Sequence, residues 1–138
     1  MVKPSSPLAR AWLSKALSDL ETARQIGGLP EGHLDAGIYH CQQAAEKVLK
    51  GFLVYHEQPP DRIHDLGKII ERAIRIDPAF GQYVESADVL TPYAAMYRYP
   101  DEQGFLEPSR EEFDEALQHA QTIYDFVLKL LPPEAKPL

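Results

Sequence analysis

The chain has 138 residues, 44% of them hydrophobic, which fits one domain with a single core. No apolar run approaches the ~18 residues of a membrane span, and residues 1–7 lack the apolar segment of a secretory signal. The one cysteine, Cys41, excludes an intramolecular disulfide. Together these features favour the cytoplasm. The formal net charge of −7 argues against wide contact with DNA or RNA, although it leaves room for a local basic site that holds one phosphate.

Two long amphipathic helices are expected in the first half of the chain. Apolar residues recur at three- and four-residue spacing over residues 8–26, and the glycines and proline that follow end this pattern. The same spacing predicts a second helix over residues 34–55. Its polar flank carries Glu46 and Lys50, which stand four residues apart in the order that favours an ion pair.

Three further helices are expected in the second half. The third starts near residues 61–64 and runs to 76, and the fourth covers 78–97, where Pro92 should kink or split it. The fifth opens at Ser109 with a capping box and continues to residue 131. No segment alternates as a strand does. The sequence therefore predicts an all-α, up-and-down antiparallel bundle of four to five helices, forming one domain over 1–138 with its core at about 8–131.

The topology of such a bundle predicts a site at one end. If consecutive helices pack antiparallel, the third helix begins, the fourth ends and the fifth begins at the end where the second finishes. Helix N-termini carry free N–H groups that favour anions, so this end could hold a phosphate. The residues expected there as ligands are Lys50, His64, Asp65, Arg98 and Tyr99.

Each of these residues also has a purely structural interpretation. His64 and Asp65 can cap the third helix, Arg98 can pair with Asp65 or with a helix C-terminus, and Glu46 with Lys50 can be a solvated pair. The sequence has no Gly-rich phosphate loop, no nucleophile elbow and no His-x-x-x-His or Glu-x-x-His pair that would suggest a metal. No metal and no cofactor are therefore expected.

Three segments in this order resemble the HEPN family (higher eukaryotes and prokaryotes nucleotide-binding). They are QQAAEKVLK at 42–50, His64-Asp65-Leu66, and Arg98-Tyr99-Pro100, and the resemblance extends from about residue 8 to residue 131. The resemblance implies a bundle of four or five helices, usually dimeric. It also implies nucleotide binding and, in many small prokaryotic members, partnership with a minimal nucleotidyltransferase in a two-component or toxin–antitoxin pair.

Some members of this family are ribonucleases, which carry an arginine followed four to six residues later by histidine. No histidine follows Arg98 at that spacing, and eight residues separate Arg110 from His119. If this chain is a ribonuclease, His64 would be the base that takes the 2′-hydroxyl proton and Arg98 the cation that binds the phosphate.

Three hypotheses for function therefore stay open. The first is a nucleotide- or phosphate-binding module that partners a nucleotidyltransferase, the second a divergent metal-independent ribonuclease that uses His64 and Arg98, and the third a structural dimer module. A homodimer is expected because the bundle has more apolar positions than one small core requires. The residues expected at its interface are Trp12, Tyr93, Tyr97, Tyr99, Phe105 and Leu106.

Overall fold

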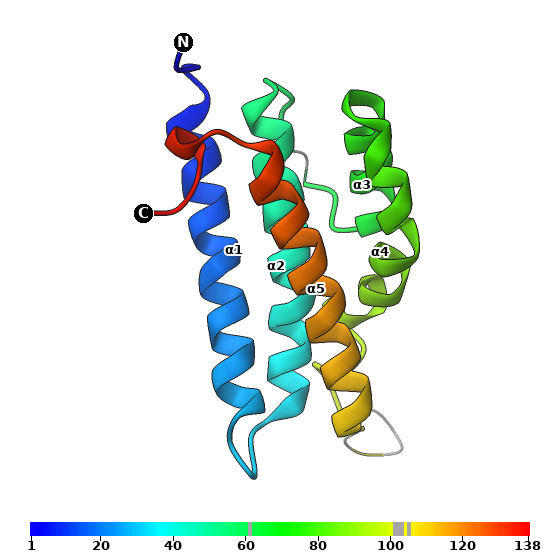
Figure 1. Cartoon of the computed structure of the whole chain (residues 1–138). Coiled ribbons are helices and arrows are strands. Elements are labelled where there is room, and N and C mark those ends of the chain that lie inside the picture. Colours follow the sequence, from blue (N-terminus) through cyan, green and yellow to red (C-terminus); the bar gives the residue numbers. More distant parts are fainter. Residues whose placement is uncertain (61, 101–103, 105) are drawn as a thin grey trace.

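A computed structural model describes residues 1–60, 62–100, 104 and 106–138 of the chain. Within these ranges the chain forms five α-helices and no β-strand (Figure 1), which confirms the predicted all-α bundle. The helices are α1 (Ser6–Gly27), α2 (Leu34–Tyr55), α3 (Leu66–Ile76), α4 (Val84–Leu90) and α5 (Arg110–Leu130). Three 3₁₀ turns accompany them: η1 (Pro78–Tyr83), η2 (Thr91–Ala94) and η3 (Pro133–Ala135).

The core forms where α1, α2 and α5 pack together with very small residues at their contacts. A Cβ atom on Gly51 of α2 would lie 2.4 Å from Leu13 of α1. At the opposite end of α2, the ring of Phe113 from α5 lies so close to Gly27 and Gly37 that a Cβ on either would approach it to 2.6 Å. Side chains at these glycines would force the helices apart, so the glycines allow α5 to pack directly against the start of α2.

The helices alternate in direction along the chain, with one exception at α3. His64, just before α3, contacts Glu46 in the middle of α2, whereas Phe80, just after α3, packs on Phe52 near the end of α2, with ring centroids 4.6 Å apart. Helix α3 therefore runs in the same direction as α2, as Figure 1 also shows. The prediction that the third helix starts where α2 finishes is wrong.

The connection between α2 and α3 explains this difference. Glu57 adopts a left-handed conformation (φ 61°), and the amide of Gln58 donates to the carbonyl of Leu53 at 2.9 Å, so the chain reverses directly after α2. His64 lies back beside the middle of α2, and a stretch of seven residues between the turn and α3 is long enough to cover that distance. Asp61, at the expected start of the third helix, lies outside the described residues.

The reversal also moves the start of α5. Because α3 runs upward beside α2, α5 begins at the end of the bundle where α2 begins, and the guanidinium of Arg110 donates to the carbonyl of Gly27 at 2.7 Å. Ser109 caps this helix as predicted, with its Oγ accepting from the amide of Glu112 at 3.0 Å.

The fourth predicted helix is split as expected, since α4 ends at Leu90 and Pro92 lies in η2. Within the described ranges, none of the helices is long and apolar enough to cross a lipid bilayer.

Candidate functional site

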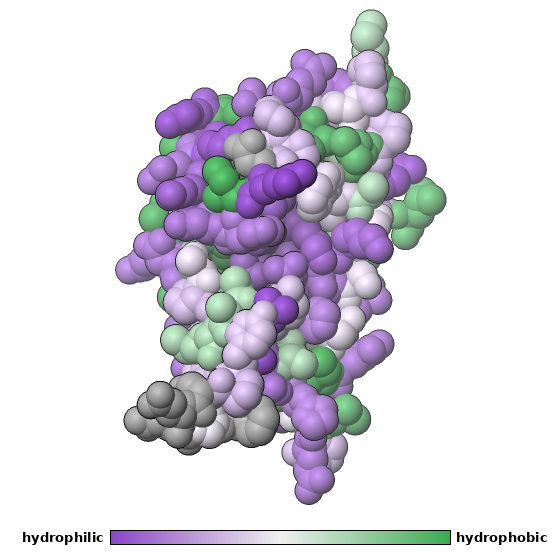
Figure 2. All heavy atoms as spheres, turned by 180° about the vertical axis from the view of Figure 1, so that it is seen from behind, coloured by the Kyte–Doolittle hydropathy of each residue, from purple (hydrophilic) through white to green (hydrophobic). Residues whose placement is uncertain are grey.

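A polar groove lies between α2 and the segment 94–98, on the side of α2 that faces away from α5. One part of it, a pocket of about 300 Å³, is lined by Tyr39, Gln43, His64, Ala94 and Arg98. An adjoining pocket of about 210 Å³ is lined by Asp35, Ala36, Tyr39, Tyr97 and Arg98. Because Tyr39 and Arg98 belong to both pockets, we treat them as one surface and call it the α2 groove. Figure 2 shows this side of the molecule, on which hydrophilic residues cover much of the middle of the face.

Arg98 lies at the junction of the two pockets. Its guanidinium carbon is 4.5 Å from the centroid of the Tyr39 ring and 5.3 Å from that of Tyr99, so two aromatic faces hold it in place. Its Nη1 donates to the carbonyl of Ala94 at 3.3 Å. In the part of the chain that the structure describes, no carboxylate pairs with Arg98. The groove therefore presents an exposed positive charge with donors to spare for an anion.

His64 lines the same pocket and is held by a buried carboxylate. Its Nδ1 donates to Oε2 of Glu46 at 3.0 Å, while the histidine side chain stays 70% exposed and that of Glu46 only 5%. A carboxylate that accepts from one ring nitrogen fixes the orientation of the ring and leaves Nε2 to act as donor or acceptor. His64 and Arg98 thus form two walls of one pocket, as the sequence predicts, but beside the middle of α2 rather than at the end of the bundle.

Glu46 is the centre of a buried polar cluster. Besides His64, it accepts from Nζ of Lys50 at 3.0 Å and from Nε2 of Gln42 at 3.2 Å. The amide of Gln43, on the pocket wall, donates to Oε1 of Gln42 at 2.7 Å. The cluster connects two walls of the α2 groove through hydrogen bonds that are mostly out of contact with water, where such bonds are strongest.

The other predicted ligand residues do not line this pocket. The side chain of Lys50 is only 6% exposed, lies 5.8 Å from the ring of Trp12 and neutralises Glu46. Asp65 caps α3 by accepting from the amide of Gly67 at 2.9 Å, which is the structural interpretation of that residue. Tyr99 is exposed and touches the groove through Arg98.

Sequence reasoning missed the residues that α2 itself contributes. Asp35, Tyr39 and Gln43 stand four residues apart and therefore share one face of the helix. Glu46, three residues further on, extends this polar stripe along a helix that is otherwise mostly buried. A polar stripe of this length on a core helix is the signal that could have indicated the groove.

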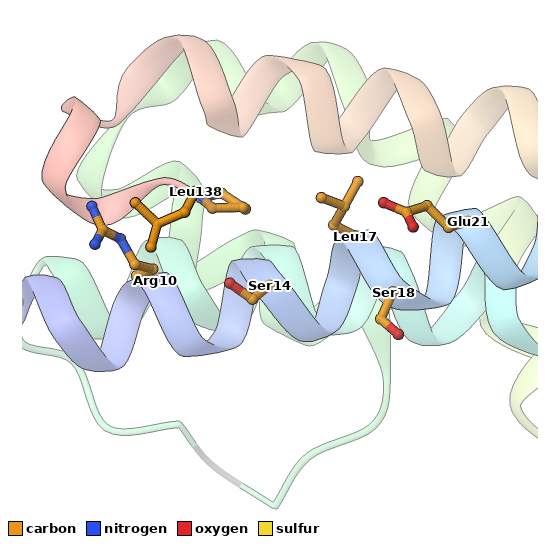
Figure 3. Close-up of a pocket in the computed structure, with 7 residues that line it drawn as sticks. Arg10, Ser14, Leu17, Ser18, Glu21 and Leu138 are labelled. Atoms are coloured by element: carbon orange, nitrogen blue, oxygen red, sulfur yellow. The ribbon is translucent and has the colours of Figure 1, made fainter.

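A second cavity lies between α1 and the C-terminal tail (Figure 3). Its volume is about 350 Å³; Arg10 and Leu138 lie at one end, and Leu17 and Glu21 lie at the other. Arg10 donates from Nε to the carbonyl of Lys136 at 2.7 Å and from Nη2 to that of Pro133 at 3.1 Å. Its cation holds the tail, so this cavity offers less to an anion than the α2 groove does. Over the described ranges, no group of three or more His, Cys, Asp or Glu side chains could hold a metal ion.

Comparison with known proteins agrees with the helix arrangement. The HEPN domain model matches residues 9–130. The structure is similar to that of TT1696 from Thermus thermophilus, with a TM-score of 0.76 and 32% identity over 89% of this chain and 98% of the other. The fold is also that of ST0689, an archaeal HEPN homologue, with a TM-score of 0.71 and 22% identity over 88% and 96% of the two chains. No curated protein matches the chain. From the family match and the likeness to TT1696, this chain belongs to the HEPN domain family.

Proposed function

We propose that this HEPN domain binds nucleotides in the α2 groove, with the phosphate between Arg98 and His64. The observation that carries the proposal is that these two side chains line one pocket of about 300 Å³. Arg98 has no carboxylate partner among the described residues, and His64 has a ring nitrogen to spare. A phosphate accepts charge-assisted hydrogen bonds from Arg98 and, when the imidazole is protonated, from Nε2 of His64.

The groove also suits the remainder of a nucleotide. Tyr39 lines both pockets, and Tyr97 lines the second one, so aromatic side chains are available along the groove for a base. The overall charge of −7 would repel a long polyanion, whereas one local cation is enough for a single nucleotide. These features favour a small nucleotide or a short single strand over duplex nucleic acid.

The partners implied by the family resemblance form a second part of the proposal. We propose that the chain acts as a homodimer and partners a minimal nucleotidyltransferase in a two-component or toxin–antitoxin system. Two exposed apolar residues flank Arg98 in sequence and support a dimer contact near the groove, namely Met96 and Tyr99; Leu106 is also exposed. Tyr93 is buried in the monomer's own core instead, and Phe105 lies outside the described residues. Light scattering tests the dimer, and a mass near 15.6 kDa at all micromolar concentrations would refute it.

A thermal-shift experiment tests the binding site. Millimolar AMP, GMP or ATP should raise the melting temperature of the wild-type chain, because a ligand that binds only the folded state stabilises it. Arg98→Ala should weaken binding about tenfold or more, since a hydrogen bond to a charged group contributes about 1.5–3 kcal/mol. Arg75→Ala, which removes an exposed arginine from α3, is the matched control. Equal stabilisation of both variants would remove Arg98 from the site.

A second candidate function is metal-independent RNA cleavage. The hydrogen bond between Glu46 and His64 favours it, because a carboxylate that orients an imidazole is a common arrangement for a general base. His64 would take the proton of a 2′-hydroxyl, and the 2′-oxygen would attack phosphorus as the bond to the 5′-oxygen breaks. The 5′-oxygen then takes a proton from water, which leaves a 2′,3′-cyclic phosphate and a 5′-hydroxyl. Arg98 would stabilise the charge on the phosphate.

An RNA degradation assay distinguishes this candidate from binding alone. The purified chain is incubated with labelled RNA in the presence of EDTA, and the product ends are analysed. His64→Ala should abolish cleavage and His33→Ala, at an exposed histidine, should not. Cleavage that survives both His64→Ala and Arg98→Ala would place the activity elsewhere or assign it to a contaminant.

A further inference from the structure

Asp35 is the part of the α2 groove that the proposed phosphate site leaves unexplained. It lines the smaller pocket together with Tyr39, Tyr97 and Arg98. Its Oδ1 is out of contact with water and has no hydrogen-bond partner among the residues that the structure describes. A buried carboxylate oxygen without a donor is unfavourable in a folded protein, and such an atom in a pocket wall is typical of a site that a ligand completes.

The position of Asp35 along α2 indicates which part of a nucleotide it would meet. At 1.5 Å per residue, Asp35 lies about 6 Å along the helix axis from Tyr39 and about 12 Å from Gln43, beside the phosphate pocket. A phosphate on the His64 side of Arg98 therefore lies in the pocket that Asp35 does not line. In a 5′-nucleotide the ribose hydroxyls are near the phosphate and the Watson–Crick edge of the base is the distant part. The spacing favours a contact between Asp35 and the base.

The chemistry of a carboxylate then selects among the bases. An ionised Asp only accepts hydrogen bonds, and its two oxygens can accept from two adjacent donors. Guanine offers two such donors side by side, N1–H and the exocyclic 2-amino group. Adenine places its N1 acceptor at the same edge, and uracil offers a single N–H between two carbonyl oxygens, so both would set acceptors against the carboxylate.

On this basis we propose that the α2 groove is selective for guanine nucleotides, with Asp35 reading the Watson–Crick edge of the base. This inference rests on the proposed nucleotide site at Arg98 and His64 and adds its substrate class. The guanine can belong to a free nucleotide or to a single-stranded RNA, because the carboxylate would recognise the same edge in both.

Isothermal titration with GMP, AMP and xanthosine monophosphate tests the proposal on three variants. The wild-type chain should bind GMP at least about tenfold more tightly than AMP, which is what a paired hydrogen bond to a base contributes. Asp35→Asn should lose most of that preference and gain affinity for the xanthine nucleotide, because an amide can donate to the oxygen that replaces the 2-amino group. Glu31→Gln, at an exposed carboxylate in the turn before α2, is the matched control for the change in charge.

The outcomes separate this inference from the function on which it rests. If GMP and AMP bind equally and Arg98→Ala weakens both, the groove binds phosphate but Asp35 does not read the base, and the inference is overturned. If Asp35→Asn keeps the wild-type preference for GMP over AMP, the preference does not come from Asp35, which also overturns the inference. If no nucleotide binds, the proposed function itself fails. A heptanucleotide RNA with one guanosine, compared with GMP, shows which of the two sources binds more tightly.

Discussion

Two buried carboxylates, Asp19 of α1 and Glu46 of α2, each hold a histidine, and they differ in what surrounds them. We define the Glu46 cluster as Glu46, Gln42, Lys50 and His64, and the Asp19 cluster as Asp19, His40 and Lys47. In the Asp19 cluster, Oδ1 accepts from Nδ1 of His40 at 2.8 Å and Oδ2 accepts from Nζ of Lys47 at 2.7 Å. Each cluster therefore joins one carboxylate, one histidine and one lysine.

The two clusters differ in how exposed their charged side chains are and in whether those side chains line a pocket. In the Asp19 cluster, Lys47 and His40 lie at the α1–α2 contact with side chains 26% and 31% exposed, and no pocket described above includes either of them. In the Glu46 cluster, Lys50 is buried and the histidine lines the groove that contains Arg98. A carboxylate–histidine pair is thus not a functional site by itself; what distinguishes the one at Glu46 is the adjoining pocket and a cation, Arg98, that no carboxylate of the described residues pairs with.

The largest expected effect concerns the stability of the two clusters. Glu46→Ala leaves the buried ammonium of Lys50 without a counter-charge, which should cost about 3–5 kcal/mol of unfolding free energy. Asp19→Ala leaves Lys47 and His40 without their partner, but both are partly exposed and water can solvate them, so its cost should be only about 1 kcal/mol. Urea denaturation of both variants measures the difference. Equal losses of unfolding free energy in the two variants would show that the Glu46 cluster contributes no more to stability than the Asp19 cluster.

A smaller effect should appear in nucleotide affinity. Glu46→Gln keeps the shape of the side chain but weakens the hydrogen bond that orients His64, so nucleotide binding should fall about fivefold to tenfold. The equivalent change at the other cluster, Asp19→Asn, should leave binding unchanged. Titration calorimetry at a temperature where both variants are fully folded measures this. If Asp19→Asn weakens binding as much, the effect is a general loss of structure rather than a change in the groove.

The smallest effect concerns a hydrogen bond that has no counterpart at the Asp19 cluster. The hydroxyl of Tyr97 donates to Glu112 of α5 and so ties the groove wall to that helix. Burial, with the hydrogen bond and charge of Glu112, raises the pKa of Tyr97 from 10.0 to about 12. The phenol therefore ionises first in the unfolded chain, and the stability it contributes should be lost as pH rises between these two values. Tyr97→Phe should flatten that alkaline decline in thermal melts, and an unchanged profile would contradict the assignment.

The sequence predicts the helices well but not the course of one connection. Apolar spacing, the Ser109 cap and the break at Pro92 indicate the helices because these signals are local. The direction of α3 depends on whether residues 56–65 turn sharply or run back along α2, and nothing local in the sequence decides that. That one error places the start of α5 at the wrong end of the bundle and brings Lys50 into the site, where the structure has it paired with Glu46 instead.

The candidate site was predictable only in part for the same reason. His64 and Arg98 lie on one pocket as expected because α3 and α4 pack antiparallel, so that the start of α3 and the segment after α4 come together whichever way α3 runs. Asp35 and Tyr39 could not be assigned, since their role depends on the segment 94–98 crossing α2 at their level. Only tertiary packing brings that segment there.

The most direct test of the central claim is to map where a nucleotide binds. Proton–nitrogen correlation spectra of the labelled chain, recorded while GMP is added, report the surroundings of each backbone amide. The claim predicts progressive shifts at Tyr39, Gln43, His64 and Arg98, with Ser14 in the cavity of Figure 3 unaffected. Shifts confined to Ser14 and the C-terminal tail, with no shift of the amides in the α2 groove, would contradict the claim.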